Sequence, residues 1–151
     1  GSGAAWAKSR RIPDLSSGVA RRMAHGMTQG EEMKKLNIPA AFDRIPEPWS
    51  PHIAARVNNQ EVRLAKIHGG FDWHHHDGVD ELFFVVKGRF TMRFRDADVA
   101  MEEGDMIVVP ANVDHMPVAE DECWVMMVEN AGTRNTGDKV TDKTKADLPV
   151  L

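Results

Sequence analysis

Two histidines and a glutamate are spaced in this sequence so that together they can bind a divalent metal ion. They belong to residues 73–81, which read Trp-His-His-His-Asp-Gly-Val-Asp-Glu. Because alternate residues of an extended strand face the same side, His74 and His76 point the same way, and the histidine between them points oppositely. A four-residue turn follows, and in a tight antiparallel hairpin it places Glu81 beside the two histidines. Two imidazoles and a carboxylate that converge in this way are a donor set for a divalent metal.

A fourth ligand is expected from a more distant part of the chain. His115 is the other histidine in this half that begins a predicted strand directly after a turn, in the segment Pro-Ala-Asn-Val-Asp-His at residues 110–115. The stretch between Glu81 and His115 is long enough for the strands needed to return to the same end of a barrel. We therefore expect one divalent metal ion, held by His74, His76, Glu81 and His115.

The donor set limits the metal and its chemistry. Imidazole and carboxylate ligands suit Fe, Zn, Ni or Mn, with Fe(II) favoured here. Four protein ligands leave two open positions on an ion that prefers six. Iron in such a site supports oxygenase chemistry, whereas Zn, Ni or Mn more naturally polarises a carbonyl or activates water. Glu81 is also the candidate catalytic base, because a carboxylate beside a cation has a tunable pKa.

Three neighbouring residues are candidates for the substrate pocket. Phe83 and Val85 share a strand face with Glu81, so both are expected to line the metal cavity. Trp73 lies beside the ligands and is expected to form a pocket wall or a lid over the barrel. In contrast, surface placement is the default for Arg63, because a charge that points inward is costly unless it is paired.

The elements that must position these residues are short strands. Turn residues separate about nine β-rich runs between residues 50 and 129, without a strong helical segment among them, and this pattern is typical of an all-β sandwich or barrel. The run from Glu81 to Val86 is apolar on both faces apart from Glu81, so a second sheet or a second subunit is expected to cover it. The predicted strands are His52–Val57, Glu61–His68, Phe71–His76, Glu81–Lys87, Arg89–Arg95, Asp98–Met101, Met106–Val109, His115–Val118 and Cys123–Glu129.

Both ligand segments resemble the two motifs of the cupin superfamily. The first motif has two histidines one residue apart, then a glutamate and, after six more residues, a glycine; the second has glycine, proline, glycine and histidine at fixed spacing, followed by asparagine. The residues that match are His74, His76, Glu81 and Gly88 in the first motif, and Gly104, Pro110 and His115 in the second. Asn112 stands where the second glycine is expected, which is a mild departure because asparagine tolerates a left-handed backbone. Ala119 replaces the final asparagine, which is not a metal ligand.

The resemblance covers roughly residues 48–130 and implies a double-stranded β-helix, or jelly-roll barrel, that is often dimeric and holds its metal inside one mouth. The family includes dioxygenases, isomerases, epimerases, decarboxylases, lyases and binders without activity, and the fold does not choose among them. We expect a mononuclear metal-dependent enzyme that acts on a small organic substrate, with dioxygenase chemistry slightly ahead. The alternatives are an isomerase or lyase acting on a sugar-like or hydroxy-acid substrate, and a metal-dependent binding module.

Composition narrows the partners. The chain has 151 residues with a formal net charge of −4, so it lacks the basic footprint of a nucleic-acid or anionic-membrane binder. A single cysteine cannot form an internal disulfide, and a cytoplasmic location is the default expectation. The predicted organisation is a leader or vector-derived segment (residues 1–36), a barrel (37–131) and a polar C-terminal arm (132–151). A homodimer and a small-molecule substrate are the expected partners.

Overall fold

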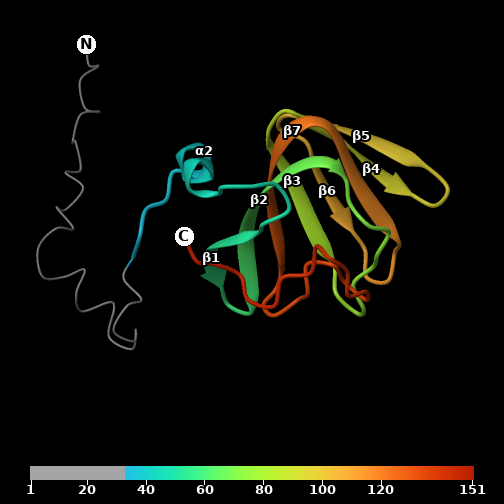
Figure 1. The fold of residues 1–151 in the computed structure, drawn as a ribbon. Coiled ribbons are helices and arrows are strands. Elements are labelled where there is room, and N and C mark those ends of the chain that lie inside the picture. The colour runs from blue at the N-terminus through green and yellow to red at the C-terminus, as the bar shows by residue number, and fades with distance from the viewer. Residues whose placement is uncertain (1–32) are drawn as a thin grey trace, which may run out of the picture. The chain divides into compact units, whose positions relative to one another are not determined.

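Antiparallel strands dominate the secondary structure of the computed structural model, which describes residues 33–151 (Figure 1). The predicted all-β fold is confirmed, and its architecture is that of a jelly roll. Within the described residues the strands are β1 (His52–Val57), β2 (Gln60–Gly70), β3 (Glu81–Lys87), β4 (Arg89–Phe94), β5 (Asp98–Glu102), β6 (Met106–Val109) and β7 (His115–Asn130). Most of the leader predicted for residues 1–36 lies outside the described residues. No helix in the described part of the chain is long and apolar enough to cross a membrane.

Strand β7 organises the barrel because it pairs with three other strands. Its second half lies between β2 and β3, where Val125 is the partner of both Ala65 and Val85. Its first half pairs with β4 as well as with the end of β2, so the same strand contributes to both sides of the barrel. The sequence predicted two separate strands here. The structure joins them through the exposed acidic residues 120–122 into one continuous strand.

The predicted strand Phe71–His76 is wrong. These residues form an irregular segment between β2 and β3 whose sole β-bridge within the described chain joins His74 to His115. The two backbones exchange hydrogen bonds of 3.1 and 2.9 Å at this bridge. Alternation along the segment still holds, since His74 and His76 are buried and His75 is partly exposed.

The hydrophobic core fills the space between the two sides of the barrel, and a second cluster covers the outside of β2, β3 and β7. The N-terminal segment, with helix α2 (Ile38–Ala41) and the 3-10 turn η1 (Phe42–Arg44), supplies that outer cluster. Phe42 stacks on Trp124 with 4.7 Å between ring centroids, and Val86 packs against the same cluster. The outer face of β3 is therefore covered in part by the chain's own N-terminal segment.

The C-terminal arm (residues 132–151) packs along the barrel. Near its end, the amide of Ile53 donates to Pro149 O and the amide of Leu151 donates to Ile53 O, at 2.8 and 2.9 Å. Its beginning lies against the segment that carries the histidines, where the amide of Asp138 donates to His75 O at 2.9 Å. The arm therefore contacts both β1 and the irregular segment that carries His74 and His76.

Candidate metal centre

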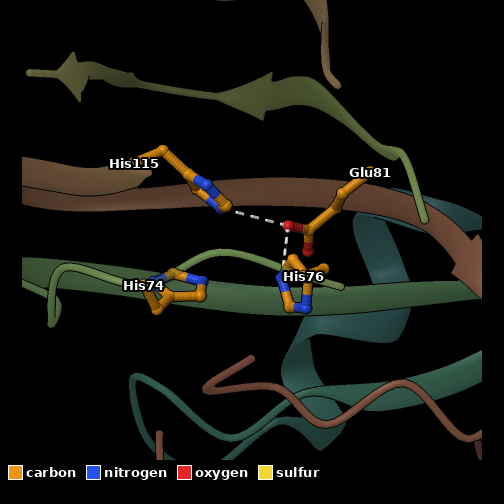
Figure 2. Close-up of side chains that lie close together, drawn as sticks. All are labelled: His74, His76, Glu81 and His115. Carbon is orange, nitrogen blue, oxygen red and sulfur yellow. Dashed lines mark ion pairs between the residues drawn. The ribbon is translucent and has the colours of Figure 1, made fainter. Parts of the chain in front are cut away.

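The structure brings the four predicted ligands together inside one end of the barrel (Figure 2). His74 and His76 come from the irregular segment, while Glu81 and His115 are the first residues of β3 and β7. Each side chain offers one donor atom, and all four atoms lie within 4.8 Å of one another. None of the four residues is more than 5% exposed. The cluster is therefore a compact, buried set of three imidazoles and one carboxylate.

Backbone carbonyls fix the orientation of two of the imidazoles. His74 Nδ1 lies 2.8 Å from Asp72 O, and His115 Nδ1 lies 2.9 Å from Val113 O. Because a carbonyl oxygen only accepts hydrogen bonds, each ring must carry its proton on Nδ1. This leaves the Nε2 lone pair of both histidines free to bind a metal, which is the usual arrangement of a ligating histidine.

Several polar atoms at the centre of the cluster are buried without a hydrogen-bond partner. Glu81 Oε2 lies 2.9 Å from His76 Nε2 and 3.3 Å from His115 Nε2. Within residues 33–151, however, none of these three atoms makes a hydrogen bond of acceptable geometry. Leaving such atoms unpaired costs about 1–3 kcal/mol each. A divalent cation would satisfy all of them at once, so the residues fit the metal that the sequence implies.

The protonation states also suit a cation. Burial, with a smaller contribution from His115, lowers the pKa of His74 to about 4, so its imidazole is neutral near pH 7. Burial acts to raise the pKa of Glu81, but the imidazoles of His115 and His76 outweigh it and lower this pKa well below its ordinary range. A neutral imidazole and an ionised carboxylate are the forms that bind metals.

A mainly apolar cavity of about 40 Å³ adjoins the cluster, which is room for a few water molecules. His74 and Glu81 form part of its wall, so the cavity opens directly onto the predicted ligands. Its aromatic side is Trp49 and Phe71, stacked with 4.7 Å between centroids, and the edge of Phe71 meets His74. The sequence analysis identified neither as a pocket residue, because Trp49 lies far from Glu81 in the sequence and strict alternation along residues 71–76 would point Phe71 away from His74.

The three predicted pocket residues fall in different places. Phe83 lines the cavity, as its shared face with Glu81 indicates. Val85 continues the same face but is fully buried in the hydrophobic core. Trp73 lies away from the cluster with its ring under the guanidinium of Arg95, whose Cζ is 4.0 Å from the ring centroid. The structure thus provides a packing role for Trp73 through a cation–π contact.

Arg63, expected at the surface, is instead buried, with 1% of its surface exposed. It is paired, which is the condition under which a charge is tolerated inside a protein. Nη1 donates to Glu129 Oε1 and Nη2 donates to Glu61 Oε2, both at 2.8 Å. We call Arg63, Glu61 and Glu129 the arginine cluster. The signal in the sequence was the placement of Glu61 and Arg63 on the same face as the apolar residues that follow them on β2.

Glu129 connects the arginine cluster to the predicted metal ligands. It lines the cavity together with Glu81. Burial raises the pKa of Glu129 well above its ordinary range; the Glu81 carboxylate adds to this increase and Arg63 opposes it. A divalent cation bound to Glu81 would offset the repulsion between the two carboxylates.

His75 faces away from the cluster, as the alternation predicts. Its Nδ1 lies 3.0 Å from Asp114 Oδ1 and its Nε2 lies 2.9 Å from Asp77 Oδ1. The hydrogen bond to Asp114 is the main cause of a raised pKa for His75, and the nearby carboxylates of Asp138 and Asp77 add to it. His75 therefore ties the ligand segment to the loop before His115 and to the C-terminal arm.

The barrel part of the chain is similar in sequence to a known family. A family model described as the cupin domain matches residues 56–129. The uncharacterized protein YdbB of Bacillus subtilis (strain 168) is 34% identical over 83 residues, which cover 54% of this chain and 74% of YdbB. The chain belongs to the cupin superfamily. The family predicted from the two motifs is thereby confirmed.

Two further relatives are informative. The solved structure of a cupin-2 domain containing protein from Shewanella frigidimarina has a TM-score of 0.62 and 36% identity, and the match covers 63% of this chain and 93% of that one. Acireductone dioxygenase of Bacillus thuringiensis (strain Al Hakam) is 28% identical over 105 residues. That match covers 62% of this cupin and 62% of the enzyme, so the chain spans less than two thirds of the enzyme's length.

Proposed function

We propose that this cupin is a mononuclear metal-dependent enzyme that acts on a small organic substrate, with Fe(II) and dioxygenase chemistry favoured. The observation that carries the proposal is the set of buried, unpaired donor atoms at the wall of an apolar cavity. The similarity to acireductone dioxygenase supports the choice of reaction class.

Different residues of the chain would bind the metal, accept a proton and pack against the substrate. His74, His76, Glu81 and His115 would hold the ion, which when bound supplies Lewis acidity and, as iron, the ability to exchange electrons. Glu81 is the candidate to accept a proton from the substrate, because a carboxylate beside a cation has a tunable pKa. Phe71, Phe83 and Trp49 would pack against the body of the substrate and exclude water.

A dioxygenase reaction has a defined balance that the assay can follow. Both atoms of O₂ enter the products, and the substrate supplies the four electrons that reduce them. Oxygen consumption therefore reports turnover directly, with a stoichiometry of one O₂ for each substrate molecule consumed.

The first test is the metal content of untagged protein expressed without metal supplementation, measured by plasma mass spectrometry. We expect about one iron per chain. Oxygen uptake by the iron-loaded protein should then exceed background with at least one member of a panel of catechols, diketones and thiols. The Glu81→Ala variant, which lacks the carboxylate ligand, is the matched control and should bind little iron and consume no oxygen.

Other results would redirect the proposal. Zinc, nickel or manganese at about one per chain would favour an isomerase or lyase. A bound metal with a tightly retained ligand and no turnover would favour a binding module. A chain that takes up no metal even after reconstitution would contradict the ligand assignment itself.

A further inference from the structure

The predicted metal does not account for every buried polar atom near the metal-ligand cluster: Asp72 Oδ2, one ring nitrogen of His76 and Glu129 Oε2 stay without a partner in the described chain. Glu129 Oε2 has no hydrogen-bond partner within the described chain, although Glu129 as a whole is only 2% exposed. The other carboxylate oxygen, Oε1, is held by Arg63 Nη1 at 2.8 Å. A buried acceptor that remains unpaired costs stability, so it calls for a partner that comes from outside the chain.

The strand register explains why Glu129 faces the cavity. Leu82 pairs with Val128 across β3 and β7, so continuing the register by one residue places Glu129 opposite Glu81. Glu129 also shares the inner face of β7 with Met127, and both line the cavity. Glu129 thus lies on the same wall as a predicted metal ligand, one strand away.

Arg63 makes the position of Glu129 rigid. Its guanidinium also donates to Glu61 through Nε and Nη2, at 3.0 and 2.8 Å, and to Thr133 O at 2.9 Å. These bonds fix the fork of the guanidinium, and the fork in turn fixes which oxygen of Glu129 faces Arg63 and which faces the cavity. The free oxygen is therefore preorganised before any ligand arrives.

The rest of the cavity wall offers few other polar groups to a ligand. Most of the lining is apolar or aromatic, and Asn135, another polar residue there, already uses its side chain within the arm, donating to Lys143 O and accepting from the amide of Lys145. An apolar pocket with a single fixed polar group selects ligands by that group.

We propose that Glu129 is a specificity-determining residue that accepts a hydrogen bond from a hydroxyl of the substrate, next to the atoms that bind the metal. This inference rests on the proposed metal site and deepens it. The substrate class is then a small, largely apolar molecule that chelates the metal at one end and carries a hydroxyl beside the chelating atoms.

The test compares two catechols that differ in one group. Pyrogallol carries a third hydroxyl next to its chelating pair, whereas 3-methoxycatechol carries a methyl ether there, which accepts hydrogen bonds but donates none. Cobalt(II)-loaded protein under nitrogen provides a visible spectrum that reports binding without turnover. We expect wild-type protein to bind pyrogallol about tenfold more tightly than 3-methoxycatechol, which is the size of one buried hydrogen bond.

The Glu129→Gln variant reverses the polarity of the atom without changing its shape. Because Arg63 only donates, the amide oxygen must face Arg63, and the amide NH₂ then takes the place of Oε2 in the cavity. We expect the preference for pyrogallol to disappear or to invert. Glu61→Gln is the matched control: Arg63 donates both of its bonds here to one oxygen of Glu61, and the amide oxygen of glutamine can still accept them, so this variant should keep the preference.

Each outcome decides the inference. An unchanged preference in Glu129→Gln would show that the third group is selected by size alone and would overturn it. Equal affinity of wild-type protein for the two catechols, or no binding of either, would overturn it without reference to any variant. Failure to bind cobalt would instead overturn the metal site on which the inference rests.

Discussion

The molecule contains two buried polar clusters within one end of the same barrel, and they differ in how their atoms are paired. In the arginine cluster, Arg63 makes hydrogen bonds of 2.8–3.0 Å to Glu61 and Glu129. In the metal-ligand cluster, the atoms at the centre are close together but lack hydrogen bonds within the described chain. The difference teaches that paired buried atoms hold a fold together, whereas unpaired ones, Glu129 Oε2 among them, are arranged for something that binds.

Removing Arg63 should give the largest effect on stability. The Arg63→Met variant leaves Glu61 and Glu129 buried without their common partner, and breaking a buried pair in this way costs about 3–5 kcal/mol of unfolding free energy. Urea denaturation of the metal-free protein measures this loss. The control is Arg56→Met, since Arg56 also contacts Glu61 but its side chain is 57% exposed, and it should cost less than about 1 kcal/mol. Equal losses in both variants would contradict the comparison.

Removing a ligand should affect metal binding more than stability. His115→Gln deletes one of the four donors, and we expect metal affinity to fall by about 100-fold or more, beyond the ~10–100-fold loss seen when a residue that supports a ligand is changed. Competition with a chelator gives the affinity. The neighbouring histidine that faces outward supplies the control: His75→Gln should retain about one metal per chain. A metal-free His115→Gln protein as unstable as Arg63→Met would argue that both clusters serve the fold.

The C-terminal arm should give an intermediate effect. Gly137 has φ +61°, and a Cβ there would lie 2.1 Å from His75 O and 3.0 Å from a ring carbon of His74. Gly137→Ala must therefore push the arm away from the ligand segment, and we expect a roughly tenfold loss of metal affinity. Gly132→Ala is the matched control, because it has φ +80° with open space around the added carbon. Both variants should lose about 1 kcal/mol of stability from the left-handed backbone, and Gly137→Ala should lose more because the arm must also shift, but only Gly137→Ala should lose metal affinity.

The smallest effect concerns pH. Asp114 raises the pKa of His75 in the folded protein, so the charged imidazole stabilises the fold below about pH 6.5, its ordinary pKa, and this contribution is lost as the pH rises through the raised value. The difference in urea midpoint between wild-type protein and His75→Gln, both metal-free, should therefore be larger at about pH 6 than at about pH 9. A difference that grows with pH would have the wrong sign for this ion pair.

The metal-ligand cluster could be predicted from the sequence because three of its four residues lie close together in the chain. His74, His76 and Glu81 lie on one short segment, and alternation together with a turn is enough to bring them together. The prediction that residues 71–76 form a strand was nevertheless wrong, since a single bridge to β7 holds this segment. Alternation survives in an extended segment whether or not it is paired, so the ligand prediction did not depend on the strand.

The arginine cluster could not be predicted in the same way. Whether Arg63 faces inward depends on Glu129 on the neighbouring strand β7, and that pairing joins residues far apart in the sequence. The cost of burying a charge argued for the surface, and the argument failed because this second partner, unlike Glu61, was not visible locally. Trp73 shows the reverse case, since its position beside the ligands suggested the pocket while Arg95 holds its ring elsewhere.

Asn112, which replaces a motif glycine, has a consequence for the unfolded chain. It keeps the left-handed backbone, with φ +66°, and its side-chain oxygen accepts a hydrogen bond from the amide of Gly78 at 3.0 Å. A glycine could adopt the same backbone but would have more conformations to lose on folding and nothing to offer Gly78. The substitution therefore lowers the conformational entropy of the unfolded loop while tying together the two turns that precede Glu81 and His115. In this cupin, a departure from the motif leaves the mouth of the barrel more rigid.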